Sequence, residues 1–144
     1  MSEVATGAIV KDFVEAATEM GKYLAAIDAD RDEFADASDR LDAAYKALAD
    51  RQEQSSLIAL LNHDDLYVRL YSAKMLLLTD EDRAAGVLDE LGKLPLHPNV
   101  AEHARFMLSR WRMGKGWLFP TRPDRGVVAF EKDIYDALRK NESG

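Results

Sequence analysis

The 144-residue sequence contains no cysteine. This absence excludes disulfide bonds, thiolate zinc sites, iron–sulfur clusters and a cysteine nucleophile. No stretch approaches the roughly 18 consecutive apolar residues that a membrane-spanning helix needs. The N-terminal run from Met1 to Ala5 also lacks the basic flank that precedes the apolar region of a signal peptide. We therefore expect a cytoplasmic protein with no membrane association.

Proline and glycine are scarce over most of the chain. The first proline is Pro95, and the sequence contains eight glycines in all. Both residues interrupt helices, so their scarcity leaves long segments free to be helical. Hydrophobic residues make up 47% of the chain, which is enough for one buried core. The composition therefore predicts a single all-α domain spanning residues 1–144.

The first part of the chain is predicted to form a helical hairpin. Apolar residues recur at alternating steps of three and four from Phe13 to Ile27, within a helix expected over about Gly7 to Ile27, and again from Phe34 to Leu48. This spacing places them on one stripe of each helix. The Asp-rich junction from Asp28 to Asp32 supplies capping oxygens and negative charge where the second helix begins.

Two pairs of shorter helices are predicted to follow from Ser55. A turn with an N-cap at residues 62–65 divides the first pair, and Pro95 and Pro98 bracket the loop in the second. Thr79 and Asp82 have the spacing of a capping box at the start of the second pair. The predicted core includes Phe13, Leu24, Leu41, Leu60, Val68, Leu76, Leu88, Met107 and Trp111.

Residues 112–126 are predicted to form an extended arm. Three glycines and two prolines interrupt this segment, so it cannot be a continuous helix. Helical spacing returns over residues 127–140, where Arg139 and Lys140 suit a helix C-terminus. We therefore expect a C-terminal helix docked on the body.

The run from Leu60 to Leu77 resembles the core of a HEAT-type repeat. In such a repeat Asp65 opens the turn, Val68 fills the groove between helices and Ala73 lets neighbouring helices approach. The Asp65 carboxylate is expected to hold the guanidinium of Arg69. The two units are spaced near 30 residues, which favours a compact bundle over a long superhelix.

Roughly residues 9–120 also resemble a family of small bacterial helical proteins known as a domain of unknown function. Three features carry this resemblance: the Arg40-Leu41 pair in the hairpin, the His-x-x-x-x-Val-Arg run from His63 to Arg69, and the Gly-Trp-x-x-Pro run from Gly116 to Pro120. Members of this family have been proposed as immunity proteins of bacterial toxin systems. The resemblance implies protein binding and no known chemistry.

Candidate catalytic groups are few. His63 and Asp64 are adjacent, but no nucleophile accompanies them in a recognisable pattern, and a structural role for His63 in the turn is the simpler interpretation. His97, Glu102 and His103 match no zinc-binding spacing, and Pro98 interrupts the helix that would align the two imidazoles. We expect no catalytic residue, no metal and no cofactor.

The charge distribution is more informative. The net charge of −7 hides an acidic segment from Asp28 to Glu53, which has nine acids against four bases, and a basic segment from His103 to Arg125, which has six bases against one acid. The acidic face of the second helix is predicted to bind a protein partner, for which a basic toxin is the candidate. Its residues are Asp32, Asp36, Asp39 and Asp42. A solvated helix face is the alternative, and a homo-oligomer is left open.

The basic segment carries a second hypothesis. Aromatic and cationic residues alternate along residues 105–125, a mixture that can stack on bases and pair with phosphates. The candidate anion-binding residues are Arg110, Arg112, Lys115, Trp117 and Arg122. Packing of the aromatics over the open end of the helical stack is the preferred interpretation, so nucleic acid is the less favoured partner.

Overall fold

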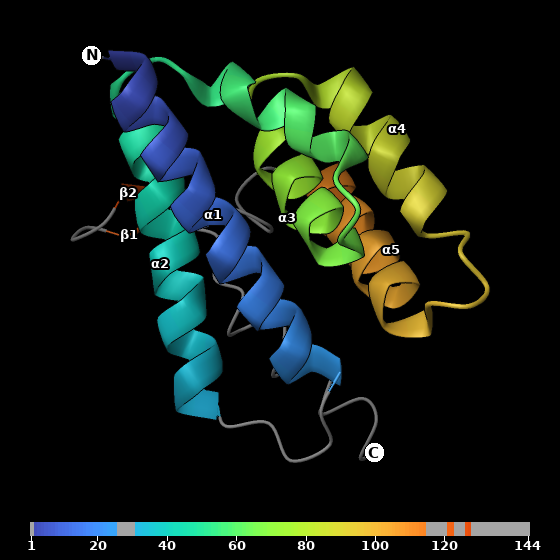
Figure 1. The fold of residues 1–144 in the computed structure, drawn as a ribbon. Helices are drawn as coiled ribbons and strands as arrows, with labels where there is room; N and C mark the ends of the chain where they lie inside the picture. The colour runs from blue at the N-terminus through green and yellow to red at the C-terminus, as the bar shows by residue number, and fades with distance from the viewer. Residues whose placement is uncertain (1, 26–30, 115–120, 123–125, 128–144) are drawn as a thin grey trace.

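The computed structural model describes residues 2–25, 31–114, 121–122 and 126–127, and the described chain is helical apart from one short pair of strands (Figure 1). The prediction of an all-α fold is confirmed. In chain order the elements are α1 (Ser2–Ala25), α2 (Arg31–Asp50), the 3₁₀ helix η1 (Gln54–Asn62), α3 (Leu66–Leu76), α4 (Glu81–Leu91), α5 (Pro98–Met113), β1 (Thr121–Arg122) and β2 (Gly126–Val127).

Helices α1 and α2 form the predicted antiparallel hairpin at one side of the molecule (Figure 1). Each helix turns one apolar stripe inward, so Phe13 and Met20 of α1 are buried together with Phe34, Leu41 and Leu48 of α2. The Asp-rich junction lies mostly at residues 26–30, outside the described part of the chain.

The turn between η1 and α3 is held by side chains of the HEAT-like motif. The Asp65 carboxylate caps α3 by accepting hydrogen bonds from the backbone N–H groups of Tyr67 (2.8 Å) and Val68 (3.3 Å). The expected Asp65–Arg69 contact is wrong: Nε of Arg69 donates to the backbone carbonyl of His63. The Asp65 carboxylate is engaged in capping α3, and the Arg69 guanidinium bonds the backbone of the same turn.

Helix α3 is the central element of the fold. It packs against α1, η1, α4 and α5, so it has almost no face left for solvent. Eight of its eleven residues are buried, and this is why its apolar residues surround the helix instead of following one stripe.

Helices α4 and α5 complete the second pair. Pro98, predicted to bound the preceding loop, lies in the first turn of α5, where a proline removes no intrahelical hydrogen bond. The predicted capping box at Thr79 is wrong, because α4 begins at Glu81 and its N-cap residue is Asp80, which makes no side-chain capping bond. The predicted core residues are buried except Trp111, which is partly buried at the end of α5.

The segment after α5 differs from the prediction at both ends. Helix α5 continues to Met113, and Gly114, with a φ of 138°, ends it in a conformation that favours glycine. Strands β1 and β2 then pair antiparallel, with Thr121 opposite Val127. Val127 therefore belongs to a strand and not to the predicted helix 127–140, whose other residues lie outside the described chain.

Candidate functional site

The acidic face of α2 is only partly as predicted. Asp32, Asp36 and Asp39 are exposed. Asp42 does not belong to this face: it is half-buried, its Oδ1 atom is shielded from solvent, and its charge acts on the buried amine of Lys74. The Asp42 side chain lies at the boundary between the solvated and packed sides of α2, where the buried amine of Lys74 attracts its carboxylate.

A groove of about 320 Å³, here called the hairpin groove, lies between α1 and α2 beside the exposed aspartates. Its floor on α2 consists of small side chains, Ala43, Ala44 and Ala47, while Asp12 and Glu15 line it from α1. Small residues keep the floor low and allow the two helices to approach.

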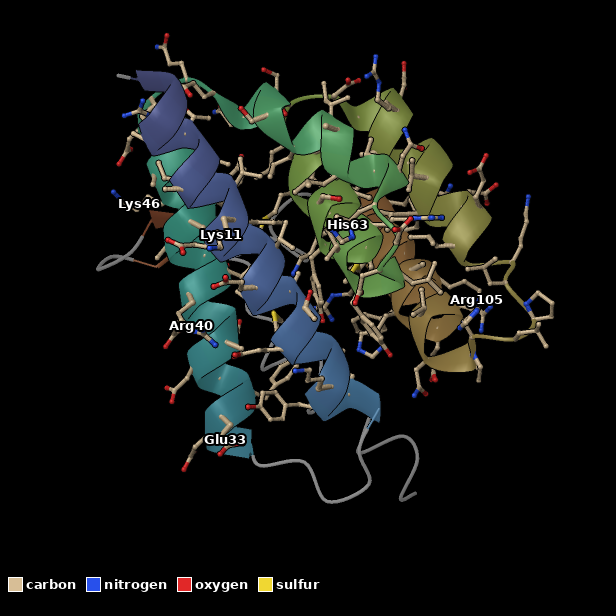
Figure 2. The ribbon with its side chains drawn as sticks, viewed as in Figure 1. Lys11, Glu33, Arg40, Lys46, His63 and Arg105 are labelled. Atoms are coloured by element: carbon tan, nitrogen blue, oxygen red, sulfur yellow. The ribbon has the colours of Figure 1, made fainter. Side chains whose placement is uncertain are left out.

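The acidic face continues the hairpin groove along α2. Asp36, Arg40, Ala43 and Ala47 fall on one stripe, since they are separated by four, three and four residues. Arg40 is the cation of this stripe, and it donates to Glu19 on the adjacent α1 (Figure 2). With Arg40 matched in this way, carboxylates dominate the groove and its extension.

The structure also reveals a buried polar cluster where α2, α3 and α5 meet. Lys74 of α3 is fully buried, and burial, opposed in part by attraction from Asp42, lowers the pKa of its amine to about 7. The Tyr71 hydroxyl is buried one turn earlier on the same helix, with no hydrogen-bond partner in the described chain. Its pKa is raised, chiefly by burial.

His103 of α5 completes this buried polar cluster. Burial, which a hydrogen bond to the backbone opposes and the positive charge of Lys74 assists, lowers the pKa of the imidazole to about 4. In that bond Nδ1 donates to the carbonyl of Asn99 at 2.9 Å. The imidazole is therefore neutral at pH 7.

The other histidines named by the sequence lie elsewhere. His63 sits in the turn before α3, where its Nδ1 accepts a hydrogen bond from the N–H of Asp65 at 3.0 Å (Figure 2). His97 is exposed just before α5, and Glu102 is half-buried on it, whereas His103 points into the core. Within the part of the chain that is described, no group of three His, Asp or Glu residues is placed to hold a metal ion.

The candidate anion-binding residues are not brought together in the described structure. Arg110 lies over the ring of Phe106 on its own helix, 5.6 Å from the ring centre, and Arg112 is exposed at the end of α5. Lys115 and Trp117 lie outside the described residues, and of Arg122 only the backbone of β1 is described.

Sequence reasoning missed the polar side chains of the buried cluster. The signal was present in α3, where Tyr71 and Lys74 interrupt a run of apolar residues at a spacing of three. A lysine is ordinarily placed on the surface because burial of its charge is costly. Only the packing of α3 on all sides shows that this lysine has no route to water.

Comparison of the chain with protein-family models, with curated proteins and with solved structures finds no match. Among the described helices, none is long and apolar enough to cross a membrane.

Proposed function

We propose that the chain is a non-enzymatic, cytoplasmic protein-binding module whose hairpin groove receives a basic protein partner. The hairpin groove carries the proposal, because it combines a floor of small residues from α2 with two carboxylates from α1, Asp12 and Glu15, and the exposed aspartates of α2 lie further along the same helix. A field of one sign steers a partner of opposite charge and opposes competitors of the same charge.

The particular role that we propose is that of an immunity protein which neutralises a basic toxin. The resemblance of residues 9–120 to the helical family described above suggests this role. The alternative, nucleic-acid binding through residues 105–125, has less support because Arg110 stacks on Phe106 within α5. The engagement of His63 in its turn and the burial of His103 give no support to a catalytic role.

The experiment is affinity capture from an extract of the source cells, with the full chain immobilised and captured proteins quantified by mass spectrometry. The variant Asp36→Lys/Asp39→Lys reverses two exposed charges beside the hairpin groove. Asp42 stays unchanged, because its reversal would place a cation against buried Lys74.

The matched control is Asp64→Lys/Glu90→Lys, which makes the same change of net charge at exposed positions away from the hairpin. Circular dichroism and thermal unfolding establish that both variants are folded. We expect the control to retain the basic proteins captured by the wild type and the α2 variant to lose them. Equal capture by the two variants would refute binding at the hairpin groove.

A further inference from the structure

A second groove, here called the α4–α5 groove, lies on the part of the molecule formed by the last helix pair. Its volume is about 620 Å³, within the roughly 300–1,000 Å³ typical of small-molecule sites. Leu88 and Leu108 lie buried beneath it, and its accessible apolar surface comes from Met113, whose side chain is 57% exposed, and from the aliphatic stems of the lining cations. The groove therefore offers an apolar surface that water covers in the free protein.

Cations surround this apolar surface. Lys93, Arg105 and Arg112 line the groove together with one acid, Asp89. The groove thus carries a formal charge of +3 − 1 = +2, in a chain whose net charge is −7. A local charge opposite in sign to that of the molecule favours an anion at this place.

The three cations differ in what already engages them. Lys93 pairs with Asp89 at 3.0 Å, and Nη1 of Arg105 donates to the carbonyl of Gly92 at 2.6 Å, where α4 ends (Figure 2). Arg112 is exposed and has no ion-pair partner in the described part of the chain. A guanidinium has five N–H donors, so Arg105 keeps donors for a ligand after bonding Gly92.

We propose that the α4–α5 groove binds an amphiphilic organic anion, in which an aliphatic chain carries a carboxylate or phosphate group. Guanidinium groups match the planar oxygens of carboxylates and the oxygens of phosphates, so Arg112 and Arg105 hold the head group. The exposed side chain of Met113 and the aliphatic stems of Arg105 and Arg112 cover the aliphatic chain, whose removal from water supplies binding energy.

A purely structural role of the cations makes a different prediction. Arg110 and Arg112 both lie in the last turn of α5, where any cation interacts favourably with the helix dipole. That explanation applies equally to the two arginines. The α4–α5 groove distinguishes them, because Arg112 lines it and Arg110 lies over Phe106.

The test is isothermal titration of the full chain with four probes: decanoate, decyl phosphate, inorganic phosphate and decanol. We expect saturable binding of at least one of the two anionic amphiphiles, and much weaker binding of inorganic phosphate and decanol. Tighter binding of decanoate identifies a free carboxylate as the head group, and tighter binding of decyl phosphate identifies a phosphate ester. Absence of binding by both amphiphiles, or equal binding of decanol, overturns the proposal.

Variants then locate the binding. Arg112→Gln should weaken it about tenfold or more, since a charged hydrogen-bond partner is lost, while Arg110→Gln is the matched control and should leave it unchanged. Ser109→Trp places a large side chain at an exposed position of the α4–α5 groove and should block binding, whereas Ser109→Ala should not. Equal losses in the two arginine variants, or full binding by Ser109→Trp, contradict the assignment.

Discussion

The burial of Lys74 cannot be predicted from the sequence, and the packing of helices around α3 explains it. Its amine is fully buried between helices, and burial lowers its pKa to about 7 while Asp42 supplies the compensating charge. Removing such charges from water costs free energy that their attraction only partly returns. The buried polar cluster therefore costs stability and restricts how α2, α3 and α5 can pack.

The first prediction concerns pH. The folded state binds a proton at Lys74 less tightly than the unfolded chain, where its pKa returns to 10.5, so stability rises with pH between about 7 and 10.5. Between pH 7 and pH 9 the rise should be on the order of 2 kcal/mol in the free energy of unfolding. Urea denaturation at the two pH values measures it. His103 acts in the same direction between about pH 4 and 6.5.

Replacement of the lysine separates this effect from other titrations. Lys74→Met has similar length and no charge, so the rise between pH 7 and pH 9 should disappear. Stability at pH 7 should fall, because the half-buried Asp42 loses the cation that compensates its charge. Lys46→Met, on the exposed side of α2, is the control and should keep the rise. A Lys74→Met protein with the wild-type pH dependence would show that this amine is not buried.

Gly21 gives a second prediction at the residue scale. A Cβ atom at this position would lie 2.4 Å from Cδ2 and 2.6 Å from Cγ of Tyr67, so α1 approaches α3 closely only because the side chain is missing. Overpacking of about 1–3 kcal/mol should outweigh the gain in helix propensity of about 1 kcal/mol, and Gly21→Ala should destabilise the protein.

Gly7 in the same helix is the matched control for Gly21. At Gly7 no atom of the described residues lies within 4 Å of the added Cβ, so Gly7→Ala should raise stability by up to about 1 kcal/mol. Equal effects of the two substitutions in urea denaturation would mean that α1 and α3 do not approach as the structure shows.

At the scale of elements, capping fixes where α3 begins. Asp65→Ala removes the acceptor of two backbone hydrogen bonds and should lower the free energy of unfolding by about 0.5–2 kcal/mol. The exposed neighbour Asp64 is the control, and Asp64→Ala should change stability by less than about 0.5 kcal/mol. Thermal or urea unfolding distinguishes the two variants. An Asp65→Ala protein as stable as the wild type would show that this carboxylate does not cap α3.

The sequence predicts elements well where one physical rule dominates. Apolar stripes predict both helices of the hairpin, the N-cap in the turn at residues 62–65 predicts the start of α3, and Pro95 and Pro98 bound the loop before α5. Prediction failed at Thr79, since a capping spacing there does not require the helix to begin at that residue, and α4 begins at Glu81. Trp111 was expected in the core, but it lies at the last turn of α5, where fewer neighbours surround it.

At the scale of the whole molecule, the candidate sites depend on contacts between helices that no local pattern specifies. The spacing of Asp32, Asp36 and Asp39 predicted one exposed face, but Asp42 left it for Lys74, a residue 32 positions further along the chain. Both grooves form between helices, so neither could be read from one helix alone. The acidic hairpin groove and the basic α4–α5 groove give the molecule two surfaces of opposite charge.

The most direct test of the central claim is the dissociation constant between the purified chain and the basic protein that it captures, measured at low and moderate salt. For a partner held at the hairpin groove, Asp36→Lys/Asp39→Lys should weaken binding at low salt by about tenfold or more, and added salt should weaken the wild-type complex. A constant that is the same for wild type and variant at both salt concentrations would contradict the claim.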